Sequence, residues 1–534
     1  MNTHRSIILR SHGFVRIATA ATASFATAAA VFLFLIADAV AVHAQANAQV
    51  RHPDIKPDAG IDLYGSILDN AGAPVAGVVV SDGFQCVATD ARGVYQMKRN
   101  PKARMVYYST PADFAINTMP KYGKGGAALF YAKITKRGKR YNFDLTRLPA
   151  PEKNFTLICV GDPQPRDESE IERFKTETVT DIFRYGKSSR LPCYAILLGD
   201  VGFDTMHLLE PMRDVASLAQ IPCFAIIGNH DHDAGISDDY KSGEGFENVF
   251  GPLNYSFTRG GVHVIGMDNV LYSGKGNYKG GFTDEQVEWL RQNLSFVPKD
   301  KIIVLAYHIP LRESAAQNRV AVHNLLKDYA GVHLMAGHTH YHENFIVSKP
   351  AKAYEHVHAT ACGAWWRSTL NKDGTPNGFA LYTFSGNKVA DWYYKATFYG
   401  RGYQMRMYRG DESFGGPGNK FSYKNATAND IVVDVWNADP EWKIVACENG
   451  VEVGPLEKLP MMVDAYAAGV HVGLQGRNPD SYGASGNGTN KHLYKHTLKD
   501  PNAKVEIRAT DRFGNTYSVS TFTTDLTGAA QYGK

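Results

Sequence analysis

Residues able to bind metal ions or move protons recur directly after apolar segments of the chain. Asp162 and Gln164 follow the apolar residues 155–160, and Asp200 follows residues 194–198. Three further apolar segments are followed by such residues: 223–227 by Asn229 and His230, 302–307 by His308, and 332–335 by His338 and His340. Carboxylate, amide and imidazole groups bind divalent metals and transfer protons.

The repetition of this pattern carries more information than any single residue in it. A lone Asp after Gly is usually a turn residue, and a lone His-x-His is usually a surface feature. His308 by itself would be a core histidine with satisfied hydrogen bonds. In open α/β sheets, however, ligands bind at the carboxyl ends of the strands. Five strands that end in the same kind of residue therefore predict one site built from five loops.

The apolar segments alternate with helical stretches, which is typical of an α/β domain with a buried sheet. Residues 168–185 and 208–219 have helical periodicity. Thr283 and Gln286 form a capping box that opens another helix. We expect this domain to span residues 151–388.

Short β-branched runs and regular turns flank this domain on both sides, which is typical of all-β structure. Residues 61–150 predict an N-terminal β-sandwich, in which 77–83 and 89–95 resemble the transthyretin-like, carboxypeptidase-regulatory type. Residues 389–534 predict a C-terminal β domain. Its glycine-rich segment 483–490 is a polar loop rather than a phosphate cradle, because no Lys-Ser/Thr pair or helix follows it.

The motifs at the strand ends resemble those of the calcineurin-like metallophosphoesterases over residues 154–385. The flanking β domains are similar to those of the exported branch of that family. The resemblance implies a four-layer α/β/β/α sandwich and a site for two divalent ions, with Asp200 as the bridge between them. The other implied ligands are Asp162, Gln164 and His340 at one ion, and Asn229, His308 and His338 at the other.

Two ions about 3.5–4 Å apart can clamp a phosphoryl centre and lower the pKa of a shared water towards about 7. The resemblance implies direct attack of this bridging hydroxide on phosphorus. His230 resembles the family histidine that stabilises charge or protonates the leaving oxygen, and Asp204 resembles its partner; a structural role for His230 is the alternative. The ligand mixture suits Mn, Fe or Zn better than Ca, and all three stay open.

Gln164 departs from the pattern of many family members, which have His at this place. A neutral amide oxygen donates more weakly than an imidazole, so this ion should be held less tightly or differ in identity. Some branches that hydrolyse diphosphates or phosphodiesters carry Asp-x-Gln here. This slightly favours a diester or an anhydride as the substrate. The alternative is that Gln164 does not touch the metal.

Candidate substrate contacts lie after the last metal motif. Trp365 and Trp366 are able to stack on a sugar or base, or to pack against a flanking domain. Asn377 is a candidate polar contact and Arg312 a candidate phosphate clamp, each weighed against a purely structural role. Three further histidines, which no family motif claims, are assigned to solvent or core: His342, His356 and His358.

The amino-acid composition limits the classes of protein and of partner that are possible. Lys and Arg total 57 against 53 Asp and Glu, so the net charge of +4 gives no electrostatic footprint for nucleic acid. Hydrophobic residues at 44% and charged residues at 21% exclude a mainly disordered chain. The six cysteines lack metal-ligand spacing. They are interpreted mostly as buried thiols, and a disulfide stays open.

The N-terminus predicts export. Residues 1–44 combine three arginines, a long apolar run and small residues before Gln45, the pattern of a cleaved signal peptide. An uncleaved membrane anchor is the alternative, because the run is long enough to span a bilayer. Residues 45–60 form a linker, and no later segment is long enough to span a membrane. We expect a soluble periplasmic or secreted protein.

The sequence thus predicts an exported, dinuclear-metal-dependent phosphoesterase that acts on a phosphorylated small molecule or a lipid-linked substrate. Within enzymes, the alternative is a phosphodiesterase or diphosphate hydrolase whose substrate is linked to a nucleotide, a sugar or a lipid. In another class, the alternative is a cell-surface binding module with an inactive phosphoesterase core.

Overall fold

The computed structural model describes residues 52–530 except 124, 313–315 and 351. The predicted signal peptide, residues 1–44, and the linker up to residue 51 lie outside the described residues. Among the described residues, no helix is both long and apolar enough to cross a membrane. All six cysteines are free thiols.

Two six-stranded sheets form the centre of the α/β region. The first has the order β21 (Lys388–Ala396), β20 (Gly378–Ser385), β9 (Asn154–Val160), β10 (Cys193–Leu198), β11 (Pro222–Ile226) and β6 (Gly126–Ala127). The second has the order β12 (Tyr255–Arg259), β13 (Val262–Gly266), β16 (Ile302–Ala306), β17 (Gly331–Ala336), β19 (Ala353–Val357) and β18 (Glu343–Val347). Strands β9, β10 and β11 run parallel to one another, as do β13, β16 and β17.

The two sheets face each other across an apolar core. Phe224 of β11 stacks on Phe257 of β12 with ring centroids 4.3 Å apart. The hydroxyl of Tyr255 donates a hydrogen bond to the carbonyl of Ala225 over 3.2 Å. These contacts join the sheets because aromatic side chains bury large apolar areas and prefer offset or tilted ring pairs.

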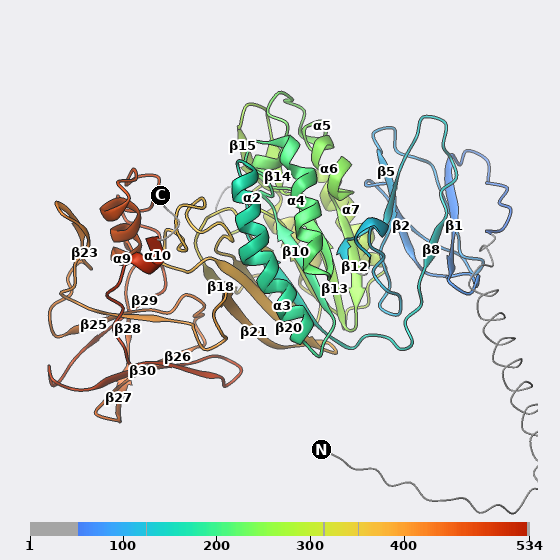
Figure 1. Ribbon diagram of the computed structural model, residues 1–534. Coiled ribbons are helices and arrows are strands. Elements are labelled where there is room, and N and C mark those ends of the chain that lie inside the picture. Colours follow the sequence, from blue (N-terminus) through green and yellow to red (C-terminus); the bar gives the residue numbers. More distant parts are fainter. Residues whose placement is uncertain (1–51, 124, 313–315, 351, 531–534) are drawn as a thin grey trace, which may run out of the picture. The chain divides into compact units, whose positions relative to one another are not determined.

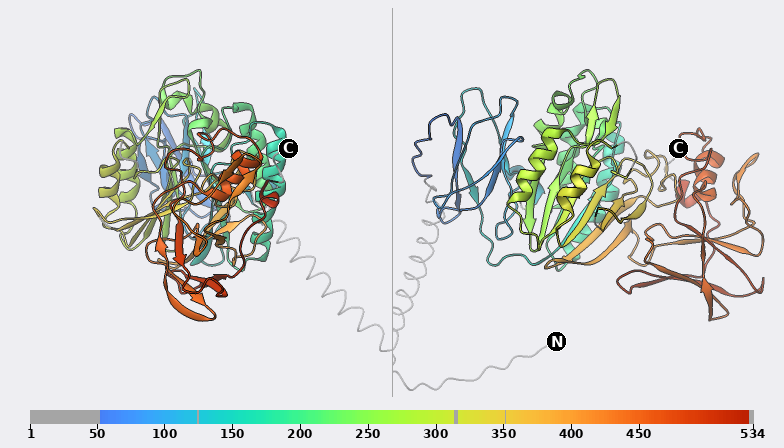
Figure 2. Two further views of the ribbon diagram at one scale, coloured as in Figure 1. Left: turned by 90° about the vertical axis from the view of Figure 1, so that its left-hand side faces the viewer. Right: turned by 180° about the vertical axis from the view of Figure 1, so that it is seen from behind.

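Helices cover the outer face of each sheet (Figures 1 and 2). On the first sheet, α2 (Glu168–Phe174), a π-helical turn (Lys175–Val179) and α3 (Thr180–Ser188) run on without a break, and α4 (Leu209–Ala216) lies beside them. On the second sheet lie α7 (Asp284–Ser295), which begins at the predicted capping box, and α8 (Arg319–Leu326). The predicted four-layer α/β/β/α class is confirmed.

The N-terminal region is a β-sandwich of two small sheets. One contains β4 (Val94–Met97), β1 (Leu63–Asp69) and β8 (Phe143–Leu145). The other contains β3 (Cys86–Ala88), β2 (Val79–Ser81), β5 (Met105–Tyr108) and β7 (Tyr131–Lys133). It packs on α7, where the indole N–H of Trp289 donates to the hydroxyl of Ser81 over 3.0 Å.

The C-terminal region is also β-rich. One sheet contains β22 (Arg406–Arg409), β25 (Asp430–Asp434), β29 (Leu493–Thr497) and β28 (Glu457–Lys458). The other contains β27 (Val451–Pro455), β26 (Lys443–Glu448), β30 (Val505–Thr510) and β31 (Thr516–Val519). It also contains a hairpin of β23 (Phe414–Gly416) and β24 (Asn419–Phe421) and the short helices α9 (Ala465–Ala468) and α10 (Thr527–Ala530). A π-helical segment (Gly469–Leu474) directly follows α9.

Several short elements lie in the loops of the α/β region. They are the hairpin of β14 (Val270–Tyr272) and β15 (Tyr278–Gly280), and the helices α5 (Asp239–Ser242) and α6 (Glu244–Phe250).

A buried charge cluster joins the C-terminal region to the α/β region. His492 contacts the carboxylate of Asp373 over 2.9 Å through Nε2 and that of Asp434 through Nδ1. All three side chains are buried. Burial alone would lower the pKa of His492, but the two carboxylates outweigh it and raise that pKa to about 10. The imidazolium therefore pairs with two carboxylates from different parts of the chain.

We predict that His492→Gln lowers the free energy of unfolding by about 3 kcal/mol at pH 6, because removing one partner leaves buried charge unpaired. The folded pKa, about 10, lies above the unfolded value of about 6.5. The contribution is therefore complete below pH about 6.5 and is lost as the pH rises through about 10. Denaturant unfolding at pH 6 and pH 9 measures this loss. The exposed His207→Gln is the matched control, and a difference independent of pH would contradict the prediction.

Candidate metal centre

The predicted site residues meet at one edge of the two facing sheets. Asp162 and Gln164 follow β9, and Asp200 follows β10. The remaining ones follow three other strands: Asn229 and His230 after β11, His308 after β16, and His338 and His340 after β17. Because parallel strands end on the same side of a sheet, these loops converge.

Glycines before the metal-binding residues allow this close approach. A Cβ on Gly228 would lie 2.1 Å from the backbone nitrogen of Asp200 and 2.2 Å from its Oδ1. A Cβ on Gly337 would lie 2.4 Å from Oδ2 of Asp162. At these two positions a side chain would occupy the space of a carboxylate. The Gly-Asn-His-Asp and Gly-His-Thr-His motifs thus begin with glycine for a steric reason.

The backbone of the site is strained. Six site residues have φ in the left-handed region: Asp162 (38°), Gln164 (27°), Asp200 (47°), Asp204 (54°), His338 (72°) and His340 (57°). Such residues cost on the order of 1–3 kcal/mol each and persist where surrounding structure holds them. Their concentration in these loops indicates a functional site.

Two buried side chains hold the strained loops. The carboxylate of Asp231 accepts hydrogen bonds from the backbone nitrogens of Val201, Gly202 and Gly228 over 2.8–3.0 Å. Oδ1 of Asn269 accepts from the backbone nitrogens of His308 and Ile309 over 3.0 and 2.9 Å. Sequence reasoning missed both residues. Asn269 follows β13, so the same strand-end rule, applied to a sixth strand, would have found it.

The metal-binding side chains form two groups that share Asp200. In each group the three candidate ligand atoms lie within 4.8 Å of one another: Asp200, His308 and His338 in one, and Asp162, Asp200 and His340 in the other. The two predicted amide ligands lie alongside. Nε2 of Gln164 is 2.8 Å from Nε2 of His340, and Oδ1 of Asn229 is 3.1 Å from Nε2 of His308.

The side-chain nitrogen and oxygen atoms of this site are better suited to bind cations than to form hydrogen bonds with one another. Nε2 of His308 and Nδ1 of His338 face each other over 3.2 Å. Oε1 of Gln164 is buried without a hydrogen-bond partner among the described residues. The two ends of an amide have the same shape, so turning Gln164 over would direct Oε1 towards Asp200 and His340. Buried acceptor atoms left without donors are costly, and a bound cation would satisfy them.

Electrostatics leads to the same conclusion. Burial raises the pKa of Asp162 to about 8 and lowers the pKa of His338 to about 3. For Asp200 and His308, their mutual attraction outweighs burial. The pKa of Asp200 falls below its usual range, and that of His308 rises to about 9. Burial alone thus favours a protonated Asp162, whereas divalent ions would favour both ionised carboxylates.

His230 and Asp204 lie at the rim of this centre. Nδ1 of His230 is 2.9 Å from Oδ1 of Asp204, and the ring stacks on Phe203 with centroids 4.2 Å apart. The backbone nitrogen of His230 donates to Oδ1 of Asp200 over 2.9 Å. This contact fixes the histidine beside the shared carboxylate, and its ring is partly open to solvent.

Of the two tryptophans, only Trp365 borders the centre. Its ring centroid lies 5.1 Å from that of His340. Trp366 is 3% exposed and its indole N–H donates to the carbonyl of Pro163 over 2.9 Å. The burial of the ring and the hydrogen bond of its one polar atom favour packing over stacking on a substrate for Trp366.

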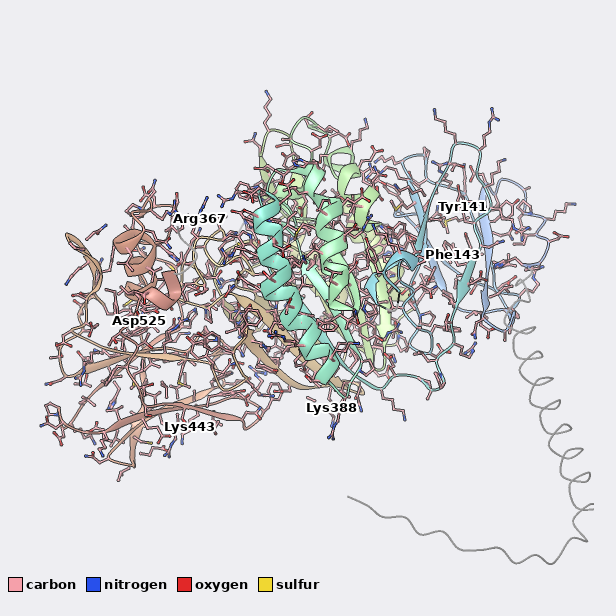
Figure 3. The ribbon with its side chains drawn as sticks, viewed as in Figure 1. Tyr141, Phe143, Arg367, Lys388, Lys443 and Asp525 are labelled. Atoms are coloured by element: carbon pink, nitrogen blue, oxygen red, sulfur yellow. The ribbon has the colours of Figure 1, made fainter. Side chains whose placement is uncertain are left out.

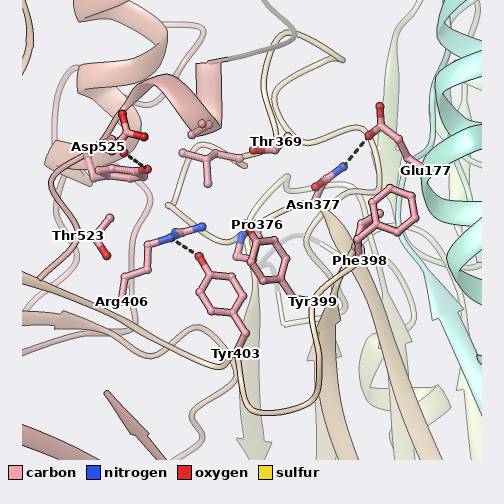
Figure 4. Close-up of a pocket in the computed structure, with 15 residues that line it drawn as sticks. Glu177, Thr369, Pro376, Asn377, Phe398, Tyr399, Tyr403, Arg406, Thr523 and Asp525 are labelled. Atoms are coloured by element: carbon pink, nitrogen blue, oxygen red, sulfur yellow. Dashed lines mark hydrogen bonds between the residues drawn. The ribbon is translucent and has the colours of Figure 1, made fainter. Parts of the chain in front are cut away.

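The other two predicted substrate contacts have protein partners instead. Asn377 donates to Glu177 over 3.2 Å and lines a separate cavity of about 500 Å³, whose described lining includes none of the predicted metal ligands (Figure 4). Arg312 forms an ion pair with Glu343, which satisfies its charge within the protein. Both side chains fit the structural role that the sequence left open for them.

The three histidines assigned to solvent or core lie in the core. His342, His356 and His358 are buried. They hydrogen-bond with Asn437, Asn344 and Tyr382 respectively, over 2.7–3.0 Å. Tertiary partners therefore account for all three.

Three family models match consecutive parts of the chain. They are the N terminal of calcineurin-like phosphoesterase over residues 62–148, calcineurin-like phosphoesterase over 147–342, and the C terminal of calcineurin-like phosphoesterase over 355–517. The chain belongs to the calcineurin-like phosphoesterases, which are metal-dependent phosphoric ester hydrolases. The predicted family and enzyme class are confirmed.

A curated relative matches part of the chain. The probable glycerophosphodiester phosphodiesterase GpdQ of Arcobacter nitrofigilis is 24% identical over 159 residues. The match covers 28% of this chain and 57% of the relative.

Solved structures are similar at low identity. A dimetal phosphatase from Danio rerio is 16% identical, over 43% of this chain and 93% of that chain, with a TM-score of 0.30. The purple acid phosphatase PPD1 from yellow lupin is 12% identical, over 60% of this chain and 66% of that chain, with a TM-score of 0.34. A 5'-nucleotidase precursor from Thermus thermophilus is 14% identical, over 46% and 55%, with a TM-score of 0.29.

We predict that Gly228→Ala weakens metal binding by about tenfold or more, because the new Cβ displaces the carboxylate shared by the two groups. Metal content per chain, measured by mass spectrometry after dialysis against Mn²⁺, checks this. The matched control is Gly400→Ala, since no atom lies within 4 Å of a Cβ at Gly400. Full metal content in a folded Gly228→Ala variant would contradict the steric argument.

Proposed function

We propose that this protein is an exported hydrolase that cleaves a phosphate ester at two divalent ions. The observation that carries the proposal is the shared carboxylate of Asp200. It belongs to both groups of ligand atoms, whose members come from loops far apart in the sequence. A bridging carboxylate has two oxygens and a negative charge, which offset the repulsion between two cations.

Seven residues would hold the ions. Asp162, Gln164 and His340 would bind one of them, Asn229, His308 and His338 the other, and Asp200 both. The mixture of carboxylate, amide and imidazole ligands suits Mn, Fe or Zn. When bound, such ions polarise the phosphoryl oxygens and supply a hydroxide nucleophile near neutral pH.

His230 would protonate the leaving oxygen. Its Nδ1 contacts Asp204, so the carboxylate holds the ring and leaves Nε2 for the substrate. Its partial exposure at the rim suits contact with a leaving group that departs towards solvent.

A phosphodiester or a diphosphate is the second candidate substrate. One relative is a probable glycerophosphodiester phosphodiesterase, and Gln164 stands where many family members have His. A neutral amide in place of imidazole leaves that ion more electrophilic, which suits a less charged phosphodiester. A phosphorylated small molecule or lipid-linked head group fits either candidate.

Export to the periplasm or the medium is the expected location. The support is the signal-peptide pattern of residues 1–44, with small residues before Gln45. N-terminal sequencing of the protein from its native host should find Gln45 at or near the first position. A chain that retains residue 1 in the membrane fraction would contradict cleavage.

Two substitutions separate metal binding from proton transfer in the Mn²⁺-loaded protein. Asp200→Asn should abolish hydrolysis and reduce bound metal, because the shared ligand loses its charge. His230→Ala should keep the metal and lower kcat by about 10²–10⁴-fold, the range of a lost general acid. Both are assayed on a nitrophenyl monoester and on a bis-nitrophenyl diester, whose relative rates identify the preferred class.

Three results would contradict these expectations. Unchanged turnover in Asp200→Asn, or a metal-loaded wild-type protein that hydrolyses no phosphate ester, would refute the function. Loss of metal in His230→Ala would make this histidine a ligand or a structural residue.

A further inference from the structure

Lys372 places a positive charge beside the candidate metal centre. Its Nζ lies 4.3 Å from the centroid of the Trp365 ring, and that ring lies 5.1 Å from the ring of His340. A cation over an aromatic face is attracted by the ring's negative π-cloud. Trp365 thus holds the ammonium group near His340, and its occupied face leaves it less suited to stack on a substrate base.

Three other cations in this part of the protein are paired with carboxylates. Arg312 and Lys491 both contact Glu343, and Arg166 contacts Glu170. For Nζ of Lys372, no carboxylate lies within ion-pair distance among the residues that the structure describes. The charge of Lys372 is therefore available to an incoming anion.

The neighbouring carboxylate is already occupied. Asp373 contacts His492, accepts from the backbone nitrogen of His342 over 2.7 Å, and accepts from Thr375. Lys372 is itself largely removed from solvent, and burial lowers its pKa to about 8. A partly buried ammonium without an ion-pair partner is stabilised when an anion arrives beside it.

Residues of the C-terminal region pack against Trp365 and Lys372. Tyr482 packs edge-on against Trp365 with centroids 5.2 Å apart. Gly483 has a φ of 69°, and a Cβ there would lie 3.2 Å from the Cβ of Lys372. This is the glycine-rich loop that the sequence left without a role. Figure 3 labels Arg367, from the same segment as Trp365, where that segment approaches the C-terminal region.

We propose that Lys372, held by Trp365 and by the loop at Tyr482 and Gly483, forms a subsite for a phosphate oxyanion of the substrate. The proposal rests on the proposed phosphoesterase function. It adds that the group bound next to His340 is a phosphate oxyanion of the substrate. The oxyanion belongs either to the scissile phosphoryl group or to a second phosphate next to it. The C-terminal region is thereby part of the substrate site.

Binding of two unreactive anions tests the subsite without turnover. Inorganic phosphate and methylenediphosphonate are titrated calorimetrically into the Mn²⁺-loaded full-length protein. Lys372→Gln should weaken binding by about tenfold or more, as expected for a lost hydrogen bond to a charged group. Lys372→Arg keeps the charge and should bind the anions more tightly than Lys372→Gln does, although the larger guanidinium changes the geometry of the stacked site. Metal content and thermal unfolding verify that each variant is loaded and folded.

Lys443→Gln is the matched control, because it removes one exposed lysine charge on the C-terminal region (Figure 3). It should leave both affinities unchanged. Weaker binding of both anions to Lys372→Gln supports a contact with the scissile phosphate. Weaker binding of methylenediphosphonate alone supports a contact with the second phosphate.

Unchanged affinity for both anions in Lys372→Gln, or no binding of either anion to the wild type, overturns the subsite. Failure of the proposed function looks different. In that case the wild type hydrolyses no ester, yet binds the anions in a manner that depends on Lys372.

Discussion

The convergence of buried carboxylates and imidazoles around Asp200 is the constraint on which the rest of the structure depends. Two carboxylates and three histidines lie close together in a mostly water-excluded space. Burial disfavours the charged forms of these groups, and the attraction between Asp200 and His308 is the largest compensation for these two residues within the protein. Such an arrangement is unfavourable for folding alone, and it becomes favourable when cations share the ligands.

Holding this arrangement requires backbone that an ordinary loop would not adopt. Left-handed residues cluster in the strand-end loops, and the glycines before them make room for carboxylates. The strain is held by buried polar side chains such as Asp231 and Asn269, which satisfy several backbone nitrogens each. Two rigid facing sheets supply the frame, since packed cores resist the displacement that would relax these loops.

The C-terminal region belongs to the same electrostatic system as the site. His492 pairs with Asp434 of its own region and with Asp373. Asp373 in turn receives the backbone nitrogen of His342, two residues after His340. A chain of buried polar contacts thus runs from the C-terminal sheet to a metal-binding loop. These contacts hold the β-rich region against the α/β region.

The sequence by itself determined the α/β class, the flanking β regions and the residues at the strand ends. Local apolar periodicity shows where the parallel strands end. Because such strands end at the same edge of a sheet, the sequence already predicted that Asp162 and His340 lie near each other. Only the tertiary structure decided whether the ring of Trp366 is buried and whether the charges of Arg312 and Lys372 are paired. Whether a ring is buried or a charge is paired depends on partners distant in the sequence, such as Glu343 for Arg312, and no local pattern encodes those contacts.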